Sequence, residues 1–108
     1  MEGKQTLKAW IEQMADGEEI EAVVFGENSR FYIEDEDDST PLGKVLPWNT
    51  ALKYLTYEFN CGFGGTECHA IVAWTKTWVI SVCQYDGATW PFRIYRNPTP
   101  CMPEMPGG

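Results

Sequence analysis

The residues with the greatest chemical potential lie in one glycine-rich stretch, Cys61-Gly62-Phe63-Gly64-Gly65-Thr66-Glu67-Cys68-His69. It holds two of the four cysteines and the only histidine, and Cys83 follows further along the chain. Zinc in proteins is held by four such ligands in a tetrahedron. The six residues between Cys61 and Cys68 make a longer spacing than the usual zinc knuckle, and Cys68 and His69 would point to opposite faces of a strand. We therefore expect no metal and no cofactor, and keep Cys61, Cys68, His69 and Cys83 as the alternative ligand set.

The same stretch could also serve a cysteine hydrolase, which needs a thiolate, a base and an orienting group. His69 begins an expected strand, and residues 69–86 in this respect resemble the base-bearing strand of papain-like and transglutaminase-like enzymes. Those families place the nucleophile upstream, at a helix N-terminus. Cys61 instead follows the C-terminus of an expected helix, where the helix dipole raises a thiol pKa. A small hydrolase or zinc-binding domain using Cys61, Cys68 and His69 is thus the alternative function, and we expect a protein that is not an enzyme.

Acidic residues form the second pattern with functional meaning. The formal charge is −8, and the first forty residues carry twelve of the sixteen acidic residues against three basic ones, a balance of −9. Such asymmetry attracts basic partners and repels phosphate backbones. The bland interpretation is a solvated segment that only keeps the protein soluble. The expected partner-binding residues are Glu18, Glu19, Glu21, Glu34, Asp35, Glu36, Asp37 and Asp38.

In character, though not in sequence, a small acidic domain without catalytic motifs resembles phage-borne anti-restriction and anti-CRISPR proteins. The resemblance implies a non-enzymatic inhibitor or modulator that occupies a basic, nucleic-acid-handling site on a larger protein. Trp78, Arg93 and Tyr95 resemble the basic and aromatic sheet faces on which bases stack, but the net charge of −8 disfavours nucleic acid as a direct partner. No stretch suggests a membrane span or a secretory signal, so we expect a cytoplasmic protein with reduced thiols.

The elements that must position these residues follow from hydrophobic periodicity. Leu7, Trp10, Ile11 and Met14 have helical spacing, with Thr6 as a cap and Gly17 as a stop. A hairpin is expected from residues 19–25 and 30–33, and a second helix from Pro47 to Phe59. Three strands, at residues 70–74, 78–85 and 89–95, form an expected meander whose last strand is an edge because Pro91 cannot donate to a ladder.

This order of elements predicts one α+β domain over residues 1–96, followed by a flexible tail rich in proline and glycine over residues 97–108. The expected architecture is an antiparallel sheet of about five strands, the hairpin plus the meander, with two helices packed on one face. The expected core residues are Trp10, Ile11, Val24, Leu52, Leu55, Ile80 and Val82, and the oligomeric state is left open.

Overall fold

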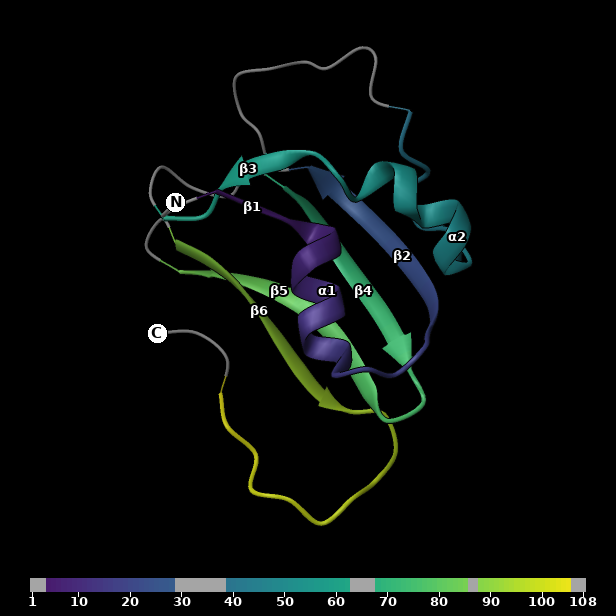
Figure 1. The fold of residues 1–108 in the computed structure, drawn as a ribbon. Coiled ribbons are helices and arrows are strands. Elements are labelled where there is room, and N and C mark those ends of the chain that lie inside the picture. Colours follow the sequence, from purple (N-terminus) through teal and green to yellow (C-terminus); the bar gives the residue numbers. More distant parts are fainter. Residues whose placement is uncertain (1–3, 29–38, 63–67, 86–87, 106–108) are drawn as a thin grey trace.

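The computed structural model describes residues 4–28, 39–62, 68–85 and 88–105, and its fold is α+β (Figure 1). A four-stranded antiparallel sheet has the order β2-β4-β5-β6, and β1 pairs with β3 in a separate two-stranded antiparallel sheet. The elements in chain order are β1 (Lys4–Thr6), α1 (Leu7–Ala15), β2 (Ile20–Asn28), α2 (Trp48–Ala51), the 3-10 helix η1 (Leu52–Tyr54), β3 (Glu58–Asn60), β4 (His69–Thr75), β5 (Trp78–Tyr85) and β6 (Ala88–Tyr95).

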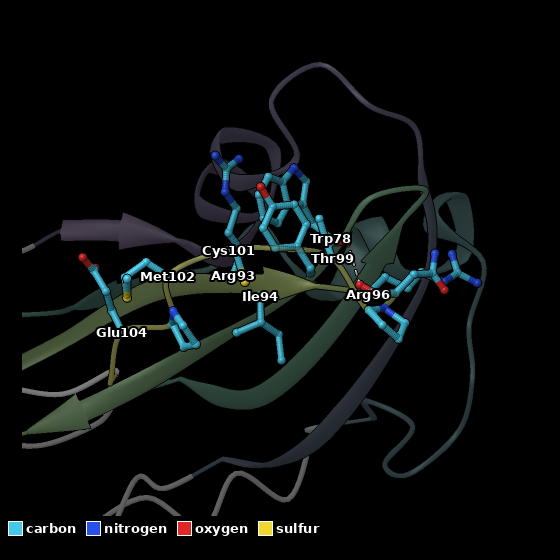
Figure 2. A pocket seen from close by; sticks show the side chains of 12 residues that line it. Trp78, Arg93, Ile94, Arg96, Thr99, Cys101, Met102 and Glu104 are labelled. Atoms are coloured by element: carbon cyan, nitrogen blue, oxygen red, sulfur yellow. Dashed lines mark hydrogen bonds between the residues drawn. The ribbon is translucent and has the colours of Figure 1, made fainter.

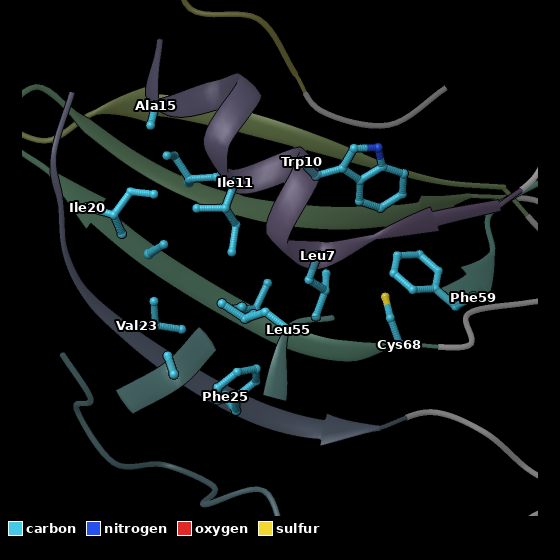
Figure 3. Packing of buried hydrophobic residues seen from close by; sticks show 14 residues of the cluster. Leu7, Trp10, Ile11, Ala15, Ile20, Val23, Phe25, Leu55, Phe59 and Cys68 are labelled. Carbon is cyan, nitrogen blue, oxygen red and sulfur yellow. The ribbon is translucent and has the colours of Figure 1, made fainter. Parts of the chain in front are cut away.

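Helix α1 begins and ends where the sequence predicts. The Thr6 side chain accepts a hydrogen bond from the Ala9 amide at 3.1 Å, which satisfies one of the donors left open at a helix start. At the other end Asp16 and Gly17 take positive φ angles of 53° and 85°, which stop the helix and turn the chain toward β2. Helix α1 lies across the four-stranded sheet, with Leu7, Trp10 and Ile11 turned toward it (Figures 1 and 3).

The meander of β4, β5 and β6 confirms the predicted strands almost to the residue. Strand β6, with Pro91, lies at one end of the described sheet. Strand β2 lies at the other end and pairs with β4, and isolated bridges from Leu42 and Leu46 run along its outer side. Residues 30–33, the expected second strand of a hairpin, lie outside the described residues.

The second helix differs most from expectation. Instead of a helix from Pro47 to Phe59, the chain forms the short α2, one turn of η1 and then strand β3. Phe59 lies on β3, is 2 % exposed, and packs edge-on against Trp10 with ring centroids 5.2 Å apart. Pairing with β1 and burial of Phe59 therefore override a periodic pattern that fits a helix. The sheet count changes with it, from one expected sheet to two.

One core lies between the helices and the inner face of the four-stranded sheet (Figure 3). The structure confirms four of the predicted core residues, Trp10, Ile11, Leu55 and Ile80, as buried. Val82 is half-buried against this core, and Leu52 is half-exposed beside it. The prediction for Val24 is wrong, because Val23 and Phe25 take the inner positions and strand alternation turns Val24 the other way.

The opposite side of the four-stranded sheet, called the outer face below, also carries apolar side chains. Burial on every second residue and the strand registers assign fourteen residues to it, and none of them is charged. They are Ala22, Val24, Gly26, Ala70, Val72, Trp74, Val79, Ser81, Cys83, Tyr85, Ala88, Trp90, Phe92 and Ile94. Glu21 and Glu27 lie at the two register shifts of β2, and both are exposed.

The described tail residues, 97–105, form neither helix nor strand and are exposed throughout. Among the described residues, no helix has the length and apolar character needed to cross a membrane.

Replacing Ile80 tests whether the core lies on the predicted face. Ile80→Ala removes buried methyl groups from a side chain that is 1 % exposed, and should lower the free energy of unfolding by about 2–5 kcal/mol. Ile80→Val should cost about 0.5–1.5 kcal/mol. Val45→Ala, at a residue 73 % exposed, is the control and should change little. Urea unfolding measures all three, and equal midpoints for Ile80→Ala and Val45→Ala would contradict this core.

Candidate functional site

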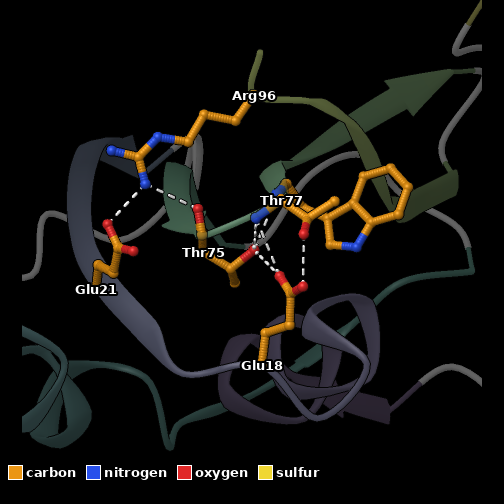
Figure 4. Close-up of polar contacts among 6 residues, drawn as sticks. Glu18, Glu21, Thr75, Thr77 and Arg96 are labelled. Carbon is orange, nitrogen blue, oxygen red and sulfur yellow. Dashed lines mark hydrogen bonds and ion pairs between the residues drawn. The ribbon is translucent and has the colours of Figure 1, made fainter. Parts of the chain in front are cut away.

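The acidic residues that follow α1 have different roles, and the role of Glu18 is structural. Its carboxylate is held by the turn that joins β4 to β5 (Figure 4). Oε1 accepts hydrogen bonds from the Thr75 hydroxyl at 2.6 Å and the Thr77 amide at 3.1 Å, and Oε2 accepts one from the Thr77 hydroxyl at 2.6 Å. These bonds, the Thr75 hydroxyl first, lower the pKa of Glu18 below its ordinary value of 4.5. Glu18 therefore fastens the start of β2 to a turn 57 residues away in sequence.

Glu21 is also paired within the chain. Nη1 of Arg96 donates to its carboxylate at 2.6 Å and to the Thr75 carbonyl at 2.8 Å (Figure 4). The ion pair joins the end of β6 to the start of β2 across the sheet. Both side chains are about two-fifths exposed, so water screens the attraction and the pair contributes little to stability.

Glu19 lies between these two residues and is exposed. Asp16 and Glu12 are exposed as well, and Glu12 pairs with Lys8 one turn earlier on α1. The structure thus brings Glu18, Glu19 and Glu21 together at one end of the sheet. Glu19 and Glu21 are both exposed, but Glu21 is engaged by Arg96. The acidic run from Glu34 to Asp38 lies outside the described residues.

His69 and Cys68 are buried and pack against neighbouring side chains. His69 is 3 % exposed and packs between the rings of Phe25 and Tyr57, each with centroids 5.6 Å from its own. Nδ1 of His69 shares a hydrogen bond of 2.7 Å with the Tyr57 hydroxyl, which also accepts from the His69 amide at 2.9 Å. An imidazole held in this way orients β4 against the segment before β3.

Cys68 is completely buried, and burial, with a smaller contribution from nearby Cys61, raises the pKa of its thiol to about 12. A thiol with this pKa stays protonated at neutral pH, and only the thiolate is a strong nucleophile or metal ligand. Burial also raises the pKa of Cys83, which lies on the outer face away from His69. Within the described part of the chain, no three His, Cys, Asp or Glu residues gather in a way that could hold a metal ion. The environments of these cysteine residues do not favour a cysteine hydrolase or a zinc site.

A groove of about 550 Å³ runs between the ends of β5 and β6 and the C-terminal segment (Figure 2). Its floor is a three-layer stack, in which the guanidinium of Arg93 lies 3.9 Å from the ring centre of Trp78 and Tyr95 stacks on Trp78 at 4.5 Å. Arg93 also donates to the Met14 carbonyl at the end of α1 at 2.7 Å. The facing wall includes Cys101 and Met102, both exposed.

This groove was not predicted from the sequence as a site. The sequence pointed to Trp78, Arg93 and Tyr95 as a possible stacking surface, but gave no signal that residues 97–105 would form a wall beside them. The charge of Arg93 is already directed to the Trp78 ring and to a helix carbonyl. The groove therefore offers aromatic surface for contact, and the Arg93 charge beside that surface is already engaged within the protein.

Comparison of the chain with protein-family models, with curated proteins and with solved structures finds no match.

The Glu18 contacts predict a specific pH dependence. Because its pKa is lower in the folded protein, the contribution of Glu18 to stability is complete above the ordinary pKa of 4.5 and is lost as pH falls through the lowered value. Glu18→Gln should lower the free energy of unfolding at neutral pH and flatten its fall below pH 4.5. Exposed Glu19→Gln is the matched control and should behave as the parent. Urea unfolding at several pH values on either side of 4.5 measures the effect. Parallel pH profiles for the parent and Glu18→Gln would contradict this role of Glu18.

Because the cysteine residues differ in burial, we expect their thiols to react at very different rates. In the native protein Cys101, which is exposed, should react with a disulfide reagent first, and Cys68 should react only on the timescale of unfolding. Mass spectrometry of the labelled peptides gives the order. Fast labelling of Cys68 in the folded protein would contradict its burial and revive the catalytic alternative.

Proposed function

We propose that this protein is a non-enzymatic protein-binding domain that occupies a basic site on a larger protein. The observation that carries the proposal is the balance of −9 in the first forty residues, within a chain whose remaining residues sum to +1. A surface of one sign raises the rate of encounter with a surface of the other sign. The proposal extends to sites that handle nucleic acid, since such sites are basic and an acidic protein can compete there with phosphates.

The described residues support a division of labour within this acidic region. Glu18 and Glu21 are committed to the fold through Thr75, Thr77 and Arg96. Glu19 turns to solvent beside them, so it is the described residue best suited to meet a basic partner. The largest share of the charge is the run Glu34–Asp38, which the proposal makes the main steering element.

An inhibitor or modulator fits this character better than a catalyst. The one histidine is packed between two rings, and the most buried thiol has its pKa raised to about 12. Neither group is prepared to act as a base or a nucleophile. A domain of this kind would act by covering a site on its partner, as anti-restriction and anti-CRISPR proteins do by analogy of character.

Charge neutralisation tests the proposal. A variant with Glu34, Asp35, Glu36, Asp37 and Asp38 changed to glutamine or asparagine should associate with a partner captured from cell extract about tenfold more slowly at low salt. The difference should shrink as salt rises, because exposed charges are screened beyond about 10 Å at 0.1 M. Stopped-flow association of the purified partner at several salt concentrations measures it.

The matched control changes five acids outside the run, and should slow association less. These are Glu2, Glu27, Glu58, Glu67 and Glu104. Equal association rates for the parent and the run variant at every ionic strength would remove the proposal and favour a segment that only keeps the protein soluble.

A further inference from the structure

The outer face of the four-stranded sheet is a second apolar surface that the core does not use. The half-buried hydrophobic residues that pack against the core include Trp78 and Val82, which point inward, but none from the outer face. Trp74, Trp90 and Phe92 all lie on that face, and Ile94 is 55 % exposed there. Contiguous apolar area of this kind on a small protein marks an interaction surface.

The strand registers arrange the outer face in rows across the sheet. One row runs Ala22, Trp74, Val79, Ile94 from β2 to β6. The next runs Val24, Val72, Ser81, Phe92. Bulky residues therefore stand on β6, and small residues stand on β2.

Beyond these rows Gly26 and Ala70 lie side by side, and a Cβ on Gly26 would come within 3.0 Å of the Ala70 Cβ. Toward the other edge of the same face, Cys83 on β5 pairs with Trp90 on β6. The corner formed by Gly26 and Ala70 is thus lower than the ridge on β6, whereas Trp74 stands at the opposite end of β4. The outer face has both a ridge and a hollow.

This relief makes the outer face complementary to itself. If a second copy is related by a two-fold axis that lies in the interface along the strands, β2 of one copy faces β6 of the other. Ala22 then lies opposite Ile94 of the second copy, and Val24 lies opposite Phe92. In the middle, Trp74 lies opposite Val79. Small residues meet large ones in each row, and two sheets stacked about 10 Å apart with nearly aligned strands are a standard packing.

The distribution of charge also favours a second copy over other occupants. None of the fourteen outer-face residues is charged, so two copies bury no charge within that set. Exposed Glu27 lies at the register shift near the end of β2, at the margin of the face. The Arg96–Glu21 pair lies at the end of the sheet, as a polar rim. A lipid surface fits poorly, since a chain of charge −8 is repelled by anionic headgroups.

The size of the face indicates a weak dimer. Four strands about 4.8 Å apart and seven to nine residues long give roughly 500 Å² in projection, or roughly 1,000 Å² for two copies before side-chain relief is added. Specific interfaces begin at about 1,000 Å². Interfaces at this lower limit belong to weak, transient complexes, although area alone does not set the Kd.

We propose that the outer face is a homodimer interface, on which a second copy of this chain packs sheet against sheet with β2 opposite β6. The dimer proposal uses none of the acidic residues to which we assign the binding of a basic partner. It also responds to salt in the opposite sense. Two copies of charge −8 repel each other, so screening should strengthen the dimer, whereas screening weakens an acidic-to-basic contact.

Sedimentation velocity of the full chain from about 1 to 500 µM, at about 0.05 and 0.5 M NaCl, tests the proposal. The parent should pass from monomer to dimer, with a lower Kd at the higher salt. Val72→Lys places a charge in the middle of the face and should raise Kd at least tenfold. Ile94→Lys, on the exposed β6 edge where folding is not at risk, should also raise it. Gln13→Lys adds the same charge on the exposed side of α1, which covers the opposite face of the sheet, and should leave Kd unchanged.

Circular dichroism and urea unfolding establish that each variant is folded before its association is compared. A parent that stays monomeric at about 500 µM overturns the proposal. It is also overturned by a dimer that folded Val72→Lys and Ile94→Lys form as well as the parent, or by a dimer that salt weakens. None of these outcomes affects the proposed binding of a basic partner, which is measured on the monomer at low concentration.

Discussion

The constraint on which the rest of the structure depends is the two-residue alternation of a sheet that is covered by helices on one side only. Helix α1 is too short to be stable by itself and is stabilised by packing Leu7 and Ile11 on that side. Its ends are set by the Thr6 cap and by the left-handed turn at Asp16. Every inner side chain that α1 covers commits its neighbour along the strand to the outer face, and so the second apolar surface is a direct consequence of how the first is buried.

The residues with reactive chemistry are mostly absorbed into this arrangement. Glu18 ties the start of β2 to the β4–β5 turn, and His69 and Cys68 lie in the core at the start of β4. Burial keeps the Cys68 thiol protonated, and the hydrogen bonds from Thr75 and Thr77 hold Glu18 as a structural carboxylate. Two surface features lie outside this arrangement: an excess of negative charge in the first forty residues, and an apolar sheet face. We propose both as binding surfaces, and we expect salt to affect them in opposite directions.

The sequence predicted the local features well. The spacing of Leu7, Trp10 and Ile11 predicted α1 with its cap, and alternation predicted the meander, because both patterns are set by neighbours along the chain. The prediction for residues 47–59 was right for the helical turns from Trp48 to Tyr54 and wrong beyond them. The burial of Phe59 depends on pairing with β1, more than fifty residues away. Val24 was assigned to the wrong face of the sheet for a related reason. The apolar run of β2 fits either face, and only the packing of Val23 and Phe25 decides which residues point inward. The Glu18–Thr75 contact and the groove beside Trp78 join distant segments, and no local pattern indicated them.

Covalent footprinting of aliphatic side chains, read by mass spectrometry, tests the one-sided burial most directly. At a concentration well below that at which copies would associate, the account predicts that Val79 is modified and its neighbour Ile80 is protected. The same contrast should hold between Ile94 on the outer face and Ile71 on the inner face. Equal modification of Val79 and Ile80, or protection of Ile94 in the dilute monomer, would contradict the account.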